Sequence, residues 1–72
     1  MRLFELSSGT RGRVISLSGE GALRSRLKAL GLKEGAEVEL LKVSPGKHTF
    51  LVRTKESVFA LGREAAACVT VE

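Results

Sequence analysis

The spacing of apolar residues predicts one short helix. Leu23, Leu27 and Leu30 fall at positions i, i+4 and i+7, which places them in a single apolar stripe along a helix. Gly31 follows at once, where the C-terminal end of a helix favours a residue that is free to adopt a positive φ. We therefore expect a helix over Ala22–Leu30 that ends at Gly31.

The rest of the chain alternates apolar and polar residues with the period of a β-strand. The strands expected from this alternation are Arg13–Leu17, Glu37–Val43, Phe50–Thr54, Ser57–Leu61 and Cys68–Val71. In the second of them the apolar positions change face after Leu40, which predicts a β-bulge or a barrel corner. The third and fourth form a hairpin across Lys55-Glu56. A type II turn is expected at Ser44-Pro45-Gly46, and a short turn, or one helical coil, over Gly62–Ala67.

About five short strands and one helix fit a mainly β fold over one domain, residues 1–72. Curling into a small β-barrel hides most strand edges, with the helix inserted after the first barrel strand. The last strand carries no residue that would block pairing, so weak self-association is left open. No apolar run is long enough to cross a bilayer and no signal peptide is present. We expect a complete, soluble, cytoplasmic protein without membrane insertion.

The chain lacks most side chains from which active sites are built. It has no Asp, Asn, Gln, Trp or Tyr, and one residue each of His and Cys. A triad would need His48 with a Glu, and a dyad would need His48 with Cys68, which we expect to be buried at the start of a strand. Zinc needs about four close ligands, so we expect no intrachain metal site, with His48 and Cys68 as its only ordinary candidate ligands. We expect no enzymatic activity and no cofactor.

The positive charge is concentrated in the first part of the chain. The net charge is +4; residues 1–28 carry six basic residues against Glu5 and Glu20, while the remainder is balanced. The candidate contact charges for an acidic partner are Arg11, Arg13, Arg24 and Lys28. These four residues are alternatively ordinary solvated charges. Nucleic acid would suit such a patch, but no aromatic residue lies among the basic ones, so we do not expect it as the partner.

The most specific stretch of the sequence is Leu23-Arg-x-Arg-Leu27-x-x-Leu30-Gly31-Leu32-x-x-Gly35-x-x-Val38. It is flanked by Leu6-x-x-Gly9-x-x-Gly12 and by Ala60-Leu61, Ala65 and Val69-x-Val71. In these motifs, in the order of elements and in the position of the glycines, the chain resembles the ferrous iron transport protein A (FeoA) family. Gly62 departs from the family, where an arginine commonly follows the Ala-Leu pair, and the Pro45-Gly46 turn is tighter than usual.

The resemblance implies an SH3-like barrel that assists FeoB, the membrane ferrous-iron transporter with a cytoplasmic GTP-binding domain. It implies no catalysis by the chain itself. The partner expected from it is the cytoplasmic domain of a FeoB-type transporter. Two alternatives are a basic barrel that binds nucleic acid and a metal-sensing module that uses His48, Cys68 and surface Glu residues.

Overall fold

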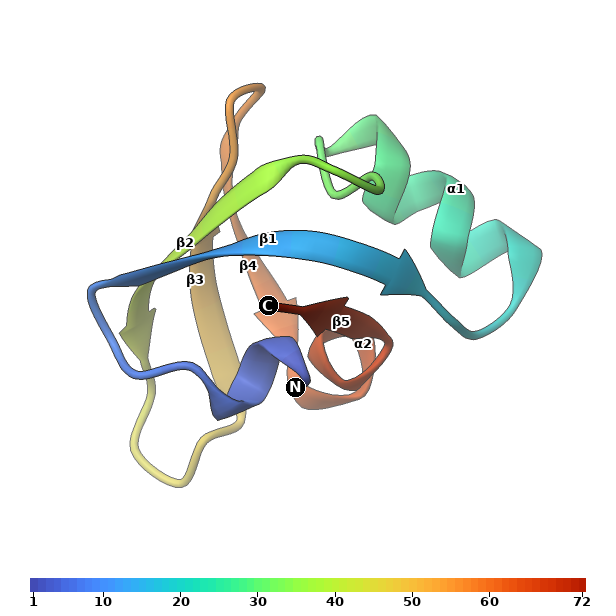
Figure 1. Cartoon of the computed structure of the whole chain (residues 1–72). Helices are drawn as coiled ribbons and strands as arrows, with labels where there is room; N and C mark the ends of the chain where they lie inside the picture. Colours follow the sequence, from blue (N-terminus) through green and yellow to red (C-terminus); the bar gives the residue numbers. More distant parts are fainter.

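A computed structural model describes all residues from Met1 to Glu72 as an antiparallel sheet with two short α-helices (Figure 1). The elements are a 3₁₀ turn η1 (Leu3–Glu5), β1 (Thr10–Leu17), α1 (Gly21–Ala29), β2 (Glu37–Val43), β3 (Thr49–Arg53), β4 (Val58–Gly62), α2 (Arg63–Ala67) and β5 (Val69–Val71). The strand order is β4-β3-β2-β1-β5. The five strands and the helix after the first strand are confirmed. No helix in the structure has the length and apolar character needed to cross a membrane.

Strand β1 is shared between the two parts of the sheet, and this sharing curls the sheet into a barrel. Its first half, Thr10–Arg13, pairs with β2, and its second half, Val14–Leu17, pairs with β5. The register shifts between Val14 and Ser16, so that Val14 and Leu17 both face inward although they are three residues apart. This bulge was not predicted from the sequence, and it leaves Ile15 43% exposed.

The change of face expected in β2 is confirmed, and of the two explanations it is a bulge. Leu40 pairs with Val52 and Lys42 pairs with Leu51, so Leu41 is the extra residue between them. Before the bulge, the buried side chains of β2 alternate with glutamates that point outward. This alternation sets two carboxylates on the outer face of the sheet.

The barrel interior is a single cluster of twelve apolar residues, with Phe50 as its largest fully buried side chain. Phe4 and Phe59 pack against its edge. Helix α1 lies on the outside of the barrel, and Leu27 is its only fully buried residue. Leu23 packs against the edge of the core cluster. The predicted leucine stripe is therefore the surface by which α1 attaches.

The edge of β5 is covered by the chain's own N-terminal residues. Val71 N–H donates to the Met1 carbonyl at 2.7 Å, and Arg2 forms a bridge with Thr70. The last strand is thus not the free edge that the sequence alone leaves open. At the other side of the sheet, β4 pairs only with β3.

Several boundaries differ from the expectation by one to three residues. Helix α1 runs one residue earlier, with Leu30 as its C-cap, and β1 begins at Thr10 instead of Arg13. The Gly62–Ala67 segment does contain the helical coil, as α2. Cys68 was wrongly placed in the last strand: it keeps helical backbone angles as the C-cap of α2, and β5 begins at Val69.

Candidate partner-binding groove

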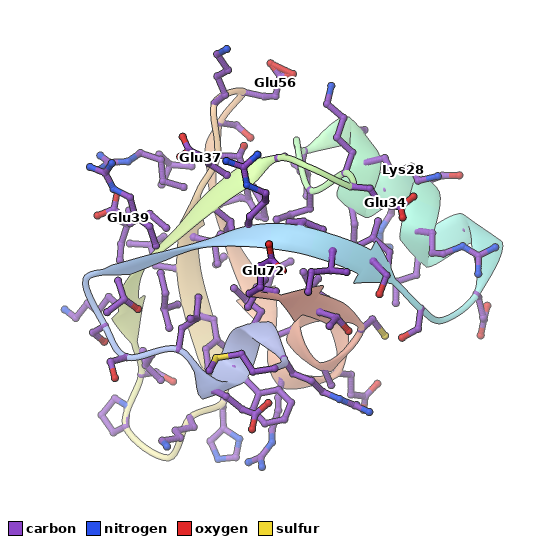
Figure 2. The ribbon with its side chains drawn as sticks, in the orientation of Figure 1. Lys28, Glu34, Glu37, Glu39, Glu56 and Glu72 are labelled. Carbon is purple, nitrogen blue, oxygen red and sulfur yellow. The ribbon has the colours of Figure 1, made fainter.

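A groove of about 800 Å³ lies where the outer face of β1, β2 and β3 meets two loops. One loop follows α1, and the other is the tip of the β3–β4 hairpin. Figure 2 shows Glu37, Glu39 and Glu56 on this side of the molecule, along β2 and at the hairpin tip. The lining residues of this charged groove are Arg11, Arg13, Gly31, Lys33, Gly35, Ala36, Glu37, Val38, Glu39, Arg53, Thr54, Lys55 and Glu56.

A row of three charged side chains crosses the sheet inside the groove. Glu39 of β2 is opposite Arg11 on one side and opposite Arg53 on the other, because strand pairing places these residues in register. Arg53 Nη2 donates to Glu39 Oε1 at 2.6 Å, and Arg11 Nε lies 3.9 Å from the same oxygen. The Glu39 side chain is 20% exposed. Two guanidinium groups thus hold one carboxylate.

The groove contains more positive than negative groups. Its lining includes five arginines or lysines and three glutamates, a difference of two positive charges. Lys33 Nζ and Glu56 Oε2 are 3.9 Å apart, so Glu56 is also paired. Arg13 and Lys55 form no salt bridge, and the Arg13 side chain makes only a long hydrogen bond of 3.5 Å to the Gly35 carbonyl. These two side chains are the cations best able to receive an acidic ligand.

A hydrogen-bonded latch holds the two loop walls of the groove together. Thr54, buried in the hairpin, donates from Oγ1 to the Leu30 carbonyl at 2.8 Å, and Ser57 Oγ donates to the same carbonyl at 3.2 Å. The end of α1 leaves this carbonyl without a partner in the helix, so the hairpin hydroxyls satisfy it. The role of Thr54 was not predicted from the sequence, because its partner lies twenty-four residues away.

Gly31 is the residue that permits this close approach. Its φ is +100°, and a Cβ atom there would lie 2.4 Å from Thr54 Oγ1 and 2.8 Å from Glu56 Cγ. The glycine was expected to end the helix, and it does. The structure adds that its missing side chain leaves the space in which the hairpin packs.

The four predicted contact residues do not all line the groove. Arg11 and Arg13 do, whereas Arg24 and Lys28 lie on α1 outside it; Figure 2 labels Lys28 on that helix. The Arg24 guanidinium donates to the Gly19 carbonyl at 2.8 Å, which ties it to the loop before the helix. Three further cations of the groove come from the part of the chain after Lys28: Lys33, Arg53 and Lys55.

His48 and Cys68 lie in surface surroundings without a set of metal ligands. His48 is exposed in the β2–β3 loop and lines a second groove of about 500 Å³ together with Arg26, Arg63 and Glu64. The Cys68 thiol is partly exposed, not buried as expected, and donates to the Glu64 carbonyl at 3.4 Å. Nowhere in the chain do three His, Cys or Glu side chains come together in a way that could hold a metal ion.

Comparison with known proteins supplies what the geometry alone does not. The model of the FeoA domain matches residues 1–72, the whole chain. The chain belongs to the FeoA family. Its association with ferrous iron transport follows from that membership, and the family is an accessory transport domain and not a known group of enzymes. A search of curated protein sequences gives no match.

Solved FeoA structures share the fold. The chain is 35% identical to FeoA of Chlorobium tepidum, with a TM-score of 0.90 and coverage of 99% of this chain and 68% of that one. It is 33% identical to the zinc complex of Stenotrophomonas maltophilia FeoA, with a TM-score of 0.86 and coverage of 100% and 89%. The latter is described as an SH3 domain protein, which confirms the SH3-like barrel.

A manganese-dependent transcriptional repressor has the same fold in part of its chain. Its TM-score is 0.89 at 18% identity, and the match covers 99% of this chain and 40% of the repressor. At this identity the likeness concerns the fold alone.

Proposed function

We propose that this FeoA-family chain is a cytoplasmic accessory protein of ferrous iron uptake, which binds the cytoplasmic GTP-binding domain of a FeoB-type transporter and modulates it. The observation that carries the proposal is the family match over residues 1–72. It is supported by the 33% identical Stenotrophomonas maltophilia protein, which has been put forward as a ferrous iron transport activating factor.

The charges of the molecule suit an acidic protein surface. Arg11 and Arg13 make direct contacts from the charged groove, while Arg24 and Lys28 on α1 add to the field that steers the partner toward it. Steering of this kind raises the association rate and weakens with salt. The contact residues therefore contribute most to binding at low ionic strength.

The test is a calorimetric titration of the full chain with the cytoplasmic domain of the transporter from the same cell. Binding is expected, and it weakens when Arg24→Glu and Lys28→Glu are combined. A matched control combines Lys42→Glu and Lys47→Glu, which make the same change of net charge at exposed positions outside both grooves. Absence of any binding by the wild-type chain at moderate salt would disprove the proposed partner.

Nucleic acid remains the rival partner for a chain of pI ≈ 9.9. Two features of the groove disfavour this alternative, since no aromatic side chain lines it and three glutamates do. A gel shift with single-stranded and duplex DNA and RNA at low salt separates the two partners. We expect no complex. Binding of a nucleic acid with higher affinity than that of the transporter domain would favour nucleic acid as the partner.

A further inference from the structure

Glu39 lies where a ligand carboxylate would be expected. Its Oε1 accepts a hydrogen bond of 2.6 Å from Arg53 and faces Arg11 at 3.9 Å. Arginine guanidinium groups are the usual recognition groups for carboxylates. The Arg11 side chain is nevertheless 73% exposed, so it can turn to another acceptor.

The arginines of β1 have a regular spacing along the strand. Arg11 and Arg13 are two residues apart, and both are exposed on the outer face. At about 3.4 Å per residue, their backbone positions are separated by roughly 7 Å. An extended peptide presents every second side chain to the same side with the same repeat. Acidic side chains at alternate positions would match the two arginines.

Two lysines on the walls of the groove, Lys33 and Lys55, add positive charge beyond the two arginines of β1. Lys55 lies at the hairpin tip without a carboxylate partner, while Lys33 is already paired with Glu56 on the opposite wall. The latch between Thr54 and Leu30 keeps these walls in place before any ligand arrives. The site is therefore largely formed in advance, which lowers the cost of binding.

We infer that the charged groove binds an extended acidic segment of a protein, with carboxylates at alternate residues, and that Glu39 competes with this segment for Arg11 and Arg53. This inference rests on the proposed function, since it names the part of the partner that the groove would recognise. By this competition Glu39 lowers the affinity of the groove for such a segment. Its removal strengthens binding, whereas loss of the groove cations weakens it.

The Glu39→Gln variant tests this competition and keeps a side chain of about the same size at position 39. The amide oxygen still accepts a hydrogen bond from Arg53, so the cross-strand contact is kept while the competing charge is lost. We expect affinity to rise about two- to fivefold, the range that corresponds to one exposed ion pair. The matched control is Glu20→Gln, because Glu20 is exposed, makes no capping hydrogen bond and lies outside the groove.

Arg13→Glu combined with Lys55→Glu tests the opposite direction. Both residues lack a salt bridge in the free protein, so reversal removes no internal ion pair. Like charges facing an acidic ligand should lower affinity by about tenfold or more. The paired control Lys42→Glu and Lys47→Glu should lower it much less.

Two probes are titrated into each variant: a short synthetic peptide in which glutamate and alanine alternate, and the transporter's cytoplasmic domain. A peptide of equal composition with all glutamates in one block serves as the control for spacing. Backbone amide chemical shifts locate the bound peptide. The inference predicts shifts around Arg11, Arg13 and Lys55, preference for the alternating peptide, and tighter binding by Glu39→Gln alone.

The outcomes separate the inference from the proposed function. Equal gains from Glu39→Gln and Glu20→Gln, or no peptide binding even at low salt, would overturn the groove as a carboxylate site. If the transporter domain binds but is indifferent to the groove variants, the inference is wrong and the proposed function stands. If the alternating peptide binds as expected and the transporter domain does not, the groove stands and the proposed partner is wrong.

Discussion

Removal of the Thr54 hydroxyl should weaken the attachment of the β3–β4 hairpin to the end of α1. Thr54 is 8% exposed, and Oγ1 donates to Leu30 O at 2.8 Å while it accepts from the amides of Glu56 and Ser57 at 3.2 and 3.3 Å. Thr54→Val keeps the shape but leaves the amides of Glu56 and Ser57 without their acceptor, while the Leu30 carbonyl keeps only the longer hydrogen bond of 3.2 Å from Ser57. A net hydrogen bond is worth about 0.5–1.5 kcal/mol, and an unsatisfied buried group costs about 1–3 kcal/mol.

We expect Thr54→Val to lower the free energy of unfolding by about 2 kcal/mol. That corresponds to a fall in Tm of roughly 8–16 °C for a domain of this size. Ser57→Ala should cost less, about 0.5–1 kcal/mol, because Thr54 still satisfies the Leu30 carbonyl. In the double variant that carbonyl has no side-chain donor. The loss of stability in the double variant should therefore exceed the sum of the losses in the two single variants.

The assay is urea unfolding followed by far-UV circular dichroism, since the chain has no tryptophan or tyrosine to report by fluorescence. A double-mutant cycle then gives the coupling energy, which we expect to be at least about 0.5 kcal/mol. Hydrogen exchange of the α1 amides should accelerate in the double variant. Strict additivity, or a loss below about 0.5 kcal/mol for Thr54→Val, would refute the latch.

Three further predictions concern glycines and metal ions. Gly31→Ala should destabilise by more than about 1 kcal/mol in thermal unfolding, through its +100° φ and the clash with the hairpin; an unchanged Tm would contradict this. Gly62→Arg, which restores the residue common in the family, should leave Tm within about 2 °C, because no atom lies within 4 Å of an added Cβ; a large loss would show hidden crowding. Equilibrium dialysis with ferrous iron or zinc should give no stoichiometric binding, since no three ligand side chains converge; one bound ion that His48→Ala removes would reverse this conclusion.

Local patterns predicted those parts of the fold that depend on neighbours in sequence. The leucine stripe of α1 and the bulge at Leu41 follow from the side-chain period, and both are confirmed. The bulge at Ile15 was missed because an apolar residue at the bulge hides the change of face. Pairing of Met1 and Arg2 with β5 could not be read from the sequence either, since it joins the two ends of the chain.

Only part of the candidate site could be predicted from the sequence, for a similar reason. Charge counts along the chain favoured the first 28 residues, and Arg11 and Arg13 do line the groove. Lys33 and Lys55 were hidden in a stretch whose charges sum to zero. Strand register and the latch decide which glutamates pair and which cations stay free, and both are long-range properties.

The central claim is that the charged groove is the surface that meets the transporter. Its most direct test is the dissociation constant of the transporter's cytoplasmic domain for the Arg11→Glu and Arg13→Glu double variant, beside the Lys42→Glu and Lys47→Glu double variant of equal net charge. The account predicts at least about a tenfold loss for the groove variant and a much smaller one for the control. Equal affinities for the two variants would contradict it.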